Sequence, residues 1–128
     1  MNPDEVAWSK FKAKLNKAKE MALFKEGEVW WCAIGLNVGS EENGKNRSFE
    51  RPTLVLRKFS GDMFWGLPLT SRTRSGKFYY TFTLGNQYST AILTQLRTLS
   101  SKRLIRRMGK IDSSNFKEIK QKTRSWIN

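Results

Sequence analysis

The chain has 128 residues, of which 38% are hydrophobic and 12% aromatic, enough for the core of one compact domain and too many for a chain that is disordered throughout. Lysine and arginine outnumber aspartate and glutamate by 24 to 11, and this net charge of +13 indicates a polyanionic partner, most commonly nucleic acid, with a charge that serves only solubility as the alternative. Because the chain has no histidine, histidine acid–base chemistry, histidine-bound metals and Ser-His-Asp or Cys-His triads are excluded.

The N-terminal segment from Pro3 to Leu23 has the pattern of an amphipathic helix. Its apolar side chains recur at three- and four-residue steps, at Trp8, Phe11, Leu15, Ala18 and Ala22. We expect residues 1–24 to form a helical extension and residues 25–128 to form the functional domain. The sequence contains no signal-peptide core and no run of about 18 apolar residues, so we expect a cytoplasmic protein without a membrane partner.

Short strands are predicted from residue 28 onward. Val29–Ile34 is apolar on both faces, which is typical of a central strand. It contains the single cysteine, Cys32, which we expect to be a buried, unreactive thiol rather than a nucleophile. The polar, glycine-rich segment Val38–Glu50 predicts a long loop.

A hairpin and two further strands follow this loop. Thr53–Phe59 and Met63–Leu69 are predicted strands, joined at a turn by Ser60, Gly61 and Asp62. Lys77–Leu84 alternates, so that its apolar side chains Phe78, Tyr80, Phe82 and Leu84 share one face. Thr90–Leu96 is a further predicted strand.

The C-terminal third predicts two helices. Ser100 or Ser101 could cap the first, which would carry Leu104 and Met108 and end at Gly109. The second would begin near Ser113–Asn115, with Asn115 and Glu118 as a capping box, and would carry an apolar stripe of Phe116, Ile119, Thr123 and Trp126. The fold class is therefore α+β, mainly a small β-barrel with helical cover.

Four segments, in this order along the chain, resemble the MazF/PemK family of toxins. They are Gly27-Glu28-Val29-Trp30-Trp31, then Val38-Gly39-Ser40-Glu41 with Arg51-Pro52-Thr53-Leu54-Val55-Leu56, then Leu67-Pro68-Leu69-Thr70-Ser71, and finally Gln95-Leu96-Arg97-Thr98-Leu99 with Lys102-Arg103-Leu104. The resemblance implies an SH3-like barrel of the CcdB/PemK type. It also implies a homodimeric endoribonuclease that needs no metal or cofactor, cuts single-stranded RNA and is neutralised by an acidic antitoxin.

Three residues are the candidates for catalysis. Arg51 is expected at a strand start after a flexible loop, where its guanidinium could stabilise a pentacovalent phosphate, and the resemblance puts the family's catalytic arginine there. Thr70 is expected at a strand end, where its hydroxyl could bind a phosphate oxygen, and the resemblance implies a functional threonine. Glu41 is the candidate base. Each of the three could instead be an ordinary surface residue.

Further residues are candidates for gripping RNA. A basic turn follows Thr70, and we expect it to track the RNA backbone while Tyr79, on the strand face opposite Phe78, stacks on a base. Gln95 and Arg97 could hold bases or phosphate, although Arg97 could equally be structural. The full set of expected RNA-binding residues is Ser71, Arg72, Arg74, Lys77, Tyr79, Gln95 and Arg97.

Two alternatives remain open. The basic run Lys102, Arg103, Arg106, Arg107 and Lys110 fits a solvated helix face or a contact for an acidic antitoxin better than a catalytic feature. A non-catalytic toxin or a nucleic-acid-binding module of the same barrel, such as one that poisons gyrase, is the alternative to the nuclease, because fold does not fix function.

Overall fold

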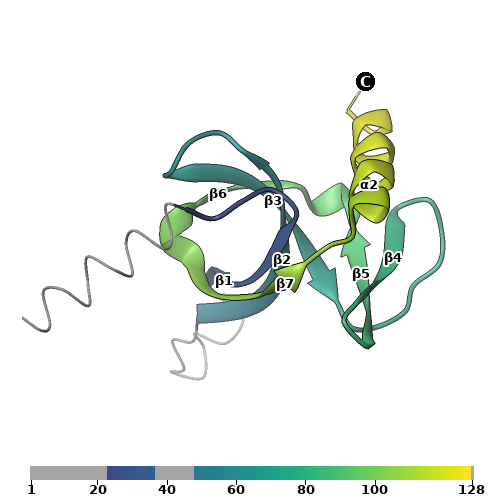
Figure 1. Ribbon diagram of the computed structural model, residues 1–128, viewed down its shortest axis with the longest axis horizontal. Helices are drawn as coiled ribbons and strands as arrows, with labels where there is room; N and C mark the ends of the chain where they lie inside the picture. The colour runs from purple at the N-terminus through teal and green to yellow at the C-terminus, as the bar shows by residue number, and fades with distance from the viewer. Residues whose placement is uncertain (1–22, 37–47, 128) are drawn as a thin grey trace, which may run out of the picture.

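The computed structural model describes residues 23–36 and 48–127, which form an antiparallel sheet with a C-terminal helix beside it (Figure 1). The strands are β1 (Glu28–Leu36), β2 (Ser48–Lys58), β3 (Met63–Thr70), β4 (Tyr79–Leu84), β5 (Gln87–Ile92), β6 (Arg97–Ser100) and β7 (Leu104–Lys110). Two 3₁₀ turns, η2 (Leu93–Gln95) and η3 (Ser101–Arg103), flank β6, and α2 spans Ser113–Ser125. The predicted N-terminal helix up to residue 22, and the loop residues 38–47, lie outside the described residues.

The strands pair in the order β4-β5-β3-β2-β1-β7, and β6 pairs separately with β3. In Figure 1, β1, β2, β3, β6 and β7 curl around one interior, while the β4–β5 hairpin lies beside α2. The mainly β architecture with a C-terminal helix is confirmed. Among the described strands the pairing forms an open path, so closure into an SH3-like barrel stays a prediction. No helix in the described ranges is long and apolar enough to cross a membrane.

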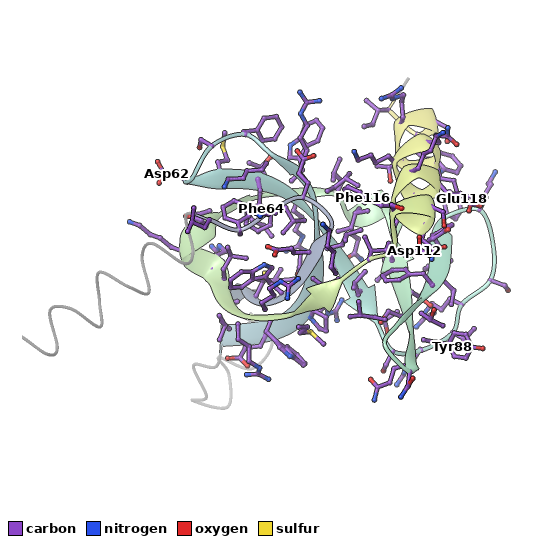
Figure 2. All side chains as sticks on the ribbon, viewed as in Figure 1. Asp62, Phe64, Tyr88, Asp112, Phe116 and Glu118 are labelled. Atoms are coloured by element: carbon purple, nitrogen blue, oxygen red, sulfur yellow. The ribbon has the colours of Figure 1, made fainter. Side chains whose placement is uncertain are left out.

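The central strands bury both of their faces because each face has its own core. On β2, Leu54 and Leu56 contribute to a core that also includes Ile119 of α2, while Val55 between them contributes to a second core. The second core contains Cys32 and also Phe64, which lies inside the curled strands (Figure 2). The central position predicted for Val29–Ile34 is confirmed, since β1 lies between β2 and β7. Val29 contributes to the first core and Cys32 to the second, whereas Trp31 and Ala33 are only half-buried.

Turn chemistry explains both hairpins. The predicted turn after β2 is confirmed, since the Phe59 amide donates to the Met63 carbonyl at 3.0 Å and the Ser60 Oγ accepts the amide of Asp62 at 3.1 Å. The β4–β5 turn has Gly85 at φ +63°, where glycine is favoured, and the ladder resumes with Leu84 paired to Gln87. As a result β5 begins and ends earlier than the predicted strand Thr90–Leu96.

The predicted helix after Ser100 is wrong, because residues 104–110 form the strand β7. Ser100 does accept the amide of Lys102 at 3.2 Å, but the helical turn that it caps ends after three residues. β7 then pairs antiparallel with β1 and supplies the hydrogen-bond partners that this edge of β1 would otherwise lack. The basic run from Lys102 to Lys110 therefore lies on a 3₁₀ turn and a strand, not on a helix face.

The C-terminal helix α2 is confirmed, but its cap differs from the predicted one. Asp112 is the N-cap and accepts the amide of Ser114 at 2.7 Å. Asn115 and Glu118 both bind the hydroxyl of Tyr80, at 2.8 and 2.9 Å, and so tie the helix to β4. Burial, together with the hydrogen bond and charge of Glu118, raises the pKa of Tyr80 to about 12.

Glu28, at the start of β1, joins three parts of the fold. Its carboxylate accepts the Lys25 amide at 2.7 Å, the Trp30 indole N–H at 3.2 Å and the Arg107 guanidinium at 2.7 Å. Burial raises the pKa of this carboxyl, but the three hydrogen bonds and the arginine charge outweigh it, so the pKa is lowered overall. Glu28 therefore stabilises the fold more strongly when it is ionised.

We expect Glu28→Gln to lower the free energy of unfolding at pH 7 by about 1–2 kcal/mol, since the charge-assisted bonds become neutral ones. Because folding lowers the pKa, the contribution is present above the unfolded value of ~4.3 and is lost as pH falls through the folded value. Urea titrations at several pH values should show the difference between variant and wild type shrinking below pH ~4. Asp62→Asn, at an exposed turn, is the control, and an equal difference at every pH would contradict the assignment.

Candidate functional site

A small hollow of about 140 Å³ lies where four strands and a 3₁₀ turn meet. Its lining residues are Ile34 of β1, Arg51 of β2, Pro68 of β3, Gln95 of η2 and Arg97 of β6. Three of them were predicted site residues, Arg51, Gln95 and Arg97, and the structure brings these together from distant parts of the chain. Two guanidinium groups and an amide around one hollow can donate several hydrogen bonds to a single anion.

Sheet pairing fixes the backbone of both arginines. Arg51 pairs with Cys32 in the β1–β2 ladder, and Arg97 pairs with Gly66 in the β3–β6 ladder. Arg51 was expected at a strand start after a flexible loop, and this expectation is wrong, because β2 already begins at Ser48. A half-buried arginine held inside a ladder is better preorganised than one on a loop, which favours its use for binding charge.

Thr70 is the last residue of β3 and lies at the same end of the β2–β3 ladder as Arg51. The ladder pairs Thr53 with Pro68, and Arg51 and Thr70 are each two residues beyond that pair. Thr70 does not line the hollow, and at this point β3 turns to pair with β5 through Thr90. Its Oγ1 accepts the amide of Arg72 at 3.2 Å, and its O–H remains a donor group for a ligand.

Residues of the predicted basic turn, 71–77, contact different aromatic side chains in the structure. Ser71, Arg72, Arg74 and Lys77 are all exposed, as expected. The Arg74 guanidinium lies 5.9 Å from the ring centre of Tyr79, so this half-buried ring carries a cation of its own chain. The Lys77 ammonium lies instead 5.6 Å from the ring of Trp126, just beyond α2. Arg74 and Tyr79 therefore form one unit, and Lys77 belongs to a different one.

Cys32 does not line the hollow. Its side chain is fully buried, and burial raises the pKa of its thiol to about 11, against a smaller opposite effect of a hydrogen bond with Thr53. The predicted burial of the thiol is confirmed, and its raised pKa disfavours the reactive thiolate.

A base for proton abstraction is not among the described residues that line the hollow, which carry no carboxylate. The predicted base, Glu41, lies outside the described residues. Sequence reasoning also missed two lining residues, Ile34 and Pro68. Pro68 could have been identified from the sequence, because it immediately precedes Leu69 and Thr70 in a segment that resembles the toxin family. Within the two described ranges, no group of three or more cysteine, aspartate or glutamate side chains could hold a metal ion.

The comparison with protein families gives a match over most of the chain. Residues 25–127 match a family described as PemK-like, MazF-like toxin of type II toxin–antitoxin system. No curated protein matches the chain by sequence.

Solved structures share the fold at low sequence identity. A MazF from Deinococcus radiodurans superimposes with a TM-score of 0.63 at 18% identity, covering 81% of this chain and 96% of its own. A chain of a MazE–MazF structure from the same organism gives a TM-score of 0.66 at 17% identity, covering 82% of this chain and 96% of its own. An endoribonuclease in complex with its cognate antitoxin, from a mycobacterial species, gives 0.60 at 14% identity, covering 80% and 92%. These similarities establish the shared fold.

Proposed function

The chain belongs to the PemK-like, MazF-like toxin family of type II toxin–antitoxin systems, and we propose that it acts as a sequence-specific endoribonuclease on single-stranded RNA. The observation that carries this proposal is the hollow in which Arg51, Gln95 and Arg97 meet. A solved relative of the same fold is described as an endoribonuclease, which supports the same activity here. The net charge of +13 favours a polyanionic substrate.

The reaction proposed is attack of a ribose 2′-hydroxyl on its own 3′-phosphate. The 2′-oxygen loses its proton and forms a bond to phosphorus, and the bond to the next 5′-oxygen breaks. That 5′-oxygen takes up a proton from water, so the products are a 2′,3′-cyclic phosphate and a 5′-hydroxyl. Arg51 stabilises the negative charge of the pentacovalent phosphate, and its proposed role is electrostatic rather than proton transfer. Thr70 donates a hydrogen bond to a phosphate oxygen, and Glu41 is proposed as the base that takes the 2′-hydroxyl proton.

Substrate binding is proposed on both sides of this centre. Arg97 and Gln95 share the hollow with Arg51, so they hold the scissile phosphate or the base next to it. Ser71, Arg72, Arg74 and Tyr79 follow Thr70 and bind the adjoining stretch of RNA, with Lys77 more distant beside Trp126. For Tyr79 to stack on a base, the Arg74 guanidinium must move aside or share the ring.

The proposed partners are an acidic antitoxin and a second copy of the chain. One solved relative is in complex with its cognate antitoxin, and a strongly basic surface attracts an acidic protein as it attracts RNA. The exposed side chains of Arg106 in β7 and Arg103 in the preceding turn η3 offer part of such a surface. A cytoplasmic location fits this role.

We expect the purified protein to cut single-stranded RNA in the presence of EDTA. The groups that line the hollow include two guanidiniums, which supply the positive charge that a metal ion would otherwise bring. The products should carry a 2′,3′-cyclic phosphate and a 5′-hydroxyl, which end-specific labelling and mass spectrometry of a long RNA would detect. Cutting that requires added magnesium or manganese would contradict the mechanism. RNA binding without any cutting would favour the alternative of a non-catalytic binding toxin.

A further inference from the structure

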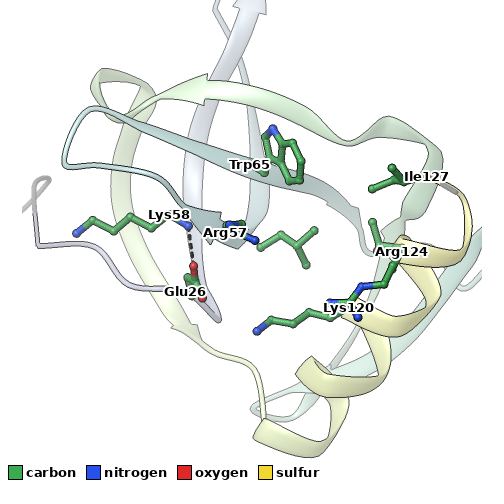
Figure 3. Close-up of a pocket in the computed structure, with 9 residues that line it drawn as sticks. Glu26, Arg57, Lys58, Trp65, Lys120, Arg124 and Ile127 are labelled. Carbon is green, nitrogen blue, oxygen red and sulfur yellow. Dashed lines mark hydrogen bonds between the residues drawn. The ribbon is translucent and has the colours of Figure 1, made fainter.

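A second, larger cavity of about 430 Å³ lies between the β2–β3 hairpin and α2 (Figure 3). It shares no lining residue with the hollow around Arg51. On β2, Arg51 and Arg57 are six residues apart, which corresponds to about 20 Å of strand. The volume falls within the usual range of small-molecule sites, roughly 300–1,000 Å³. Its lining residues are Glu26, Leu56, Arg57, Lys58, Trp65, Lys120, Thr123, Arg124 and Ile127.

Three cations face this cavity from two elements. Lys120 and Arg124 are one helical turn apart on α2, so they lie on the same face of the helix. Arg57 lies across from them on β2, just after a register shift between Val55 and Arg57 that re-aims the strand. None of the three forms an ion pair with a carboxylate in the described part of the chain. The Lys120 ammonium lies 4.3 Å from the Phe116 ring centre and the Arg57 guanidinium 5.6 Å from that of Phe59, contacts that leave their positive charge in place.

The single carboxylate of the cavity does not neutralise these cations. Glu26 accepts the backbone amide of Lys58 at 2.9 Å, and it lies beside the β2 end of the cavity in Figure 3. The Lys58 ammonium is directed elsewhere, since it donates to the Phe24 carbonyl at 2.8 Å and lies 4.5 Å from the Phe24 ring centre. The cavity therefore has an excess of positive charge toward α2.

The aromatic side chain of Trp65 lines the side of the cavity opposite Lys120, and we call it the aromatic wall (Figure 3). Trp65 pairs with Arg57 across the β2–β3 ladder, and its indole N–H donates to the Thr98 hydroxyl at 3.1 Å. The Phe59 ring contacts the Trp65 ring edge-on, with centres 5.1 Å apart. These two contacts fix the indole, and Ile127 extends the apolar surface near it. A fixed aromatic side chain that lines the same cavity as guanidinium and ammonium groups is suited to an aromatic anion.

We propose that this cavity binds a nucleoside 5′-monophosphate unit, with the phosphate at Lys120 and Arg124 and the base against Trp65. The unit has two possible sources, a free nucleotide or a nucleotide within an RNA chain, and both present the same phosphate and base. An acidic peptide would satisfy the cations but would leave the aromatic wall unused, so a nucleotide fits the lining better. Binding here does not require that the chain cut RNA.

The test is direct binding to the full chain carrying Arg51→Ala, which keeps RNA intact, at ~150 mM salt. Titration calorimetry would use each of the four nucleoside 5′-monophosphates, inorganic phosphate, a hexaglutamate peptide and a short single-stranded RNA. The cavity variant is Lys120→Gln with Arg124→Gln. The matched control is Lys117→Gln with Lys122→Gln, which removes the same charge from exposed positions of the same helix outside the cavity.

We expect the cavity variant to weaken nucleotide binding about tenfold or more and the control to stay within about twofold of the parent. If the cavity variant loses binding of the mononucleotides, a free nucleotide is sufficient to occupy the cavity. If the variant loses binding of the RNA only, the cavity binds a nucleotide within an RNA chain. Equal effects of the two double variants would overturn the proposal, as would inorganic phosphate binding as tightly as the nucleotides, or binding of the peptide alone. If the wild-type chain cuts no RNA, the proposed nuclease activity is rejected. If the cavity variant still loses nucleotide binding in that case, the nucleotide site is supported independently of the nuclease.

Discussion

Replacing Arg51 with alanine is expected to reduce RNA cleavage by about 10²–10³, equivalent to on the order of 3–4 kcal/mol of transition-state stabilisation. The guanidinium lines the hollow together with Arg97 and Gln95, and its backbone is held in β2. Its loss removes the charge that opposes the developing negative charge on phosphorus. The measurement is single-turnover cleavage of a labelled RNA, which separates the chemical step from binding and product release.

Two further variants make this result specific to Arg51. Arg51→Lys keeps the charge but loses the two-pronged donor geometry, so we expect activity between those of the wild type and the alanine variant. Lys102→Ala removes one exposed charge outside the hollow and should leave the cleavage rate within about twofold. Because Arg51 is half-buried within a strand, we expect its alanine variant to lose no more than about 1 kcal/mol of stability. Wild-type cleavage by Arg51→Ala, or unfolding of that variant, would reject the catalytic assignment.

Phe64→Ala is expected to have the largest effect on stability, a loss of about 3–5 kcal/mol in the free energy of unfolding. The Phe64 side chain is fully buried inside the curled strands, with its ring centre 5.1 Å from that of Phe24. Removing the ring leaves a cavity that the paired strands around it cannot readily close. A loss of this size is a large fraction of the roughly 5–15 kcal/mol that stabilises an ordinary domain.

Phe59→Ala provides the matched control for this variant. Phe59 is 44% exposed and contacts Trp65 edge-on, so its truncation should cost only about 1 kcal/mol. Urea titration of the three proteins at one pH gives both differences. Equal losses for the two phenylalanine variants would show that the interior of the curled strands is not a well-packed core.

Local patterns in the sequence were sufficient for the features that depend on neighbours in the chain. The unbroken apolar run Val29–Ile34 predicted a central strand, and β1 lies between β2 and β7. Ser60, Gly61 and Asp62 predicted a hairpin, and the stripe from Phe116 to Trp126 predicted α2. Composition likewise established the strong positive charge and the lack of histidine chemistry. Arg51, Gln95 and Arg97 were identified as separate candidates, each from its own segment.

Tertiary structure alone decided which of these residues meet and which strands pair. Leu104 and Met108 have helical spacing, yet residues 104–110 form β7 because β1 needs a partner along its free edge. The hollow around Arg51 forms because β3 pairs with β6 along one edge and with β2 along the other. No local pattern encodes such pairings between distant segments. The cavity of Arg57, Lys120 and Arg124 depends in the same way on the packing of α2 beside β2 and β3. The sequence by itself determined the charges and most of the strands, whereas long-range hydrogen bonding and burial determined where those charges converge.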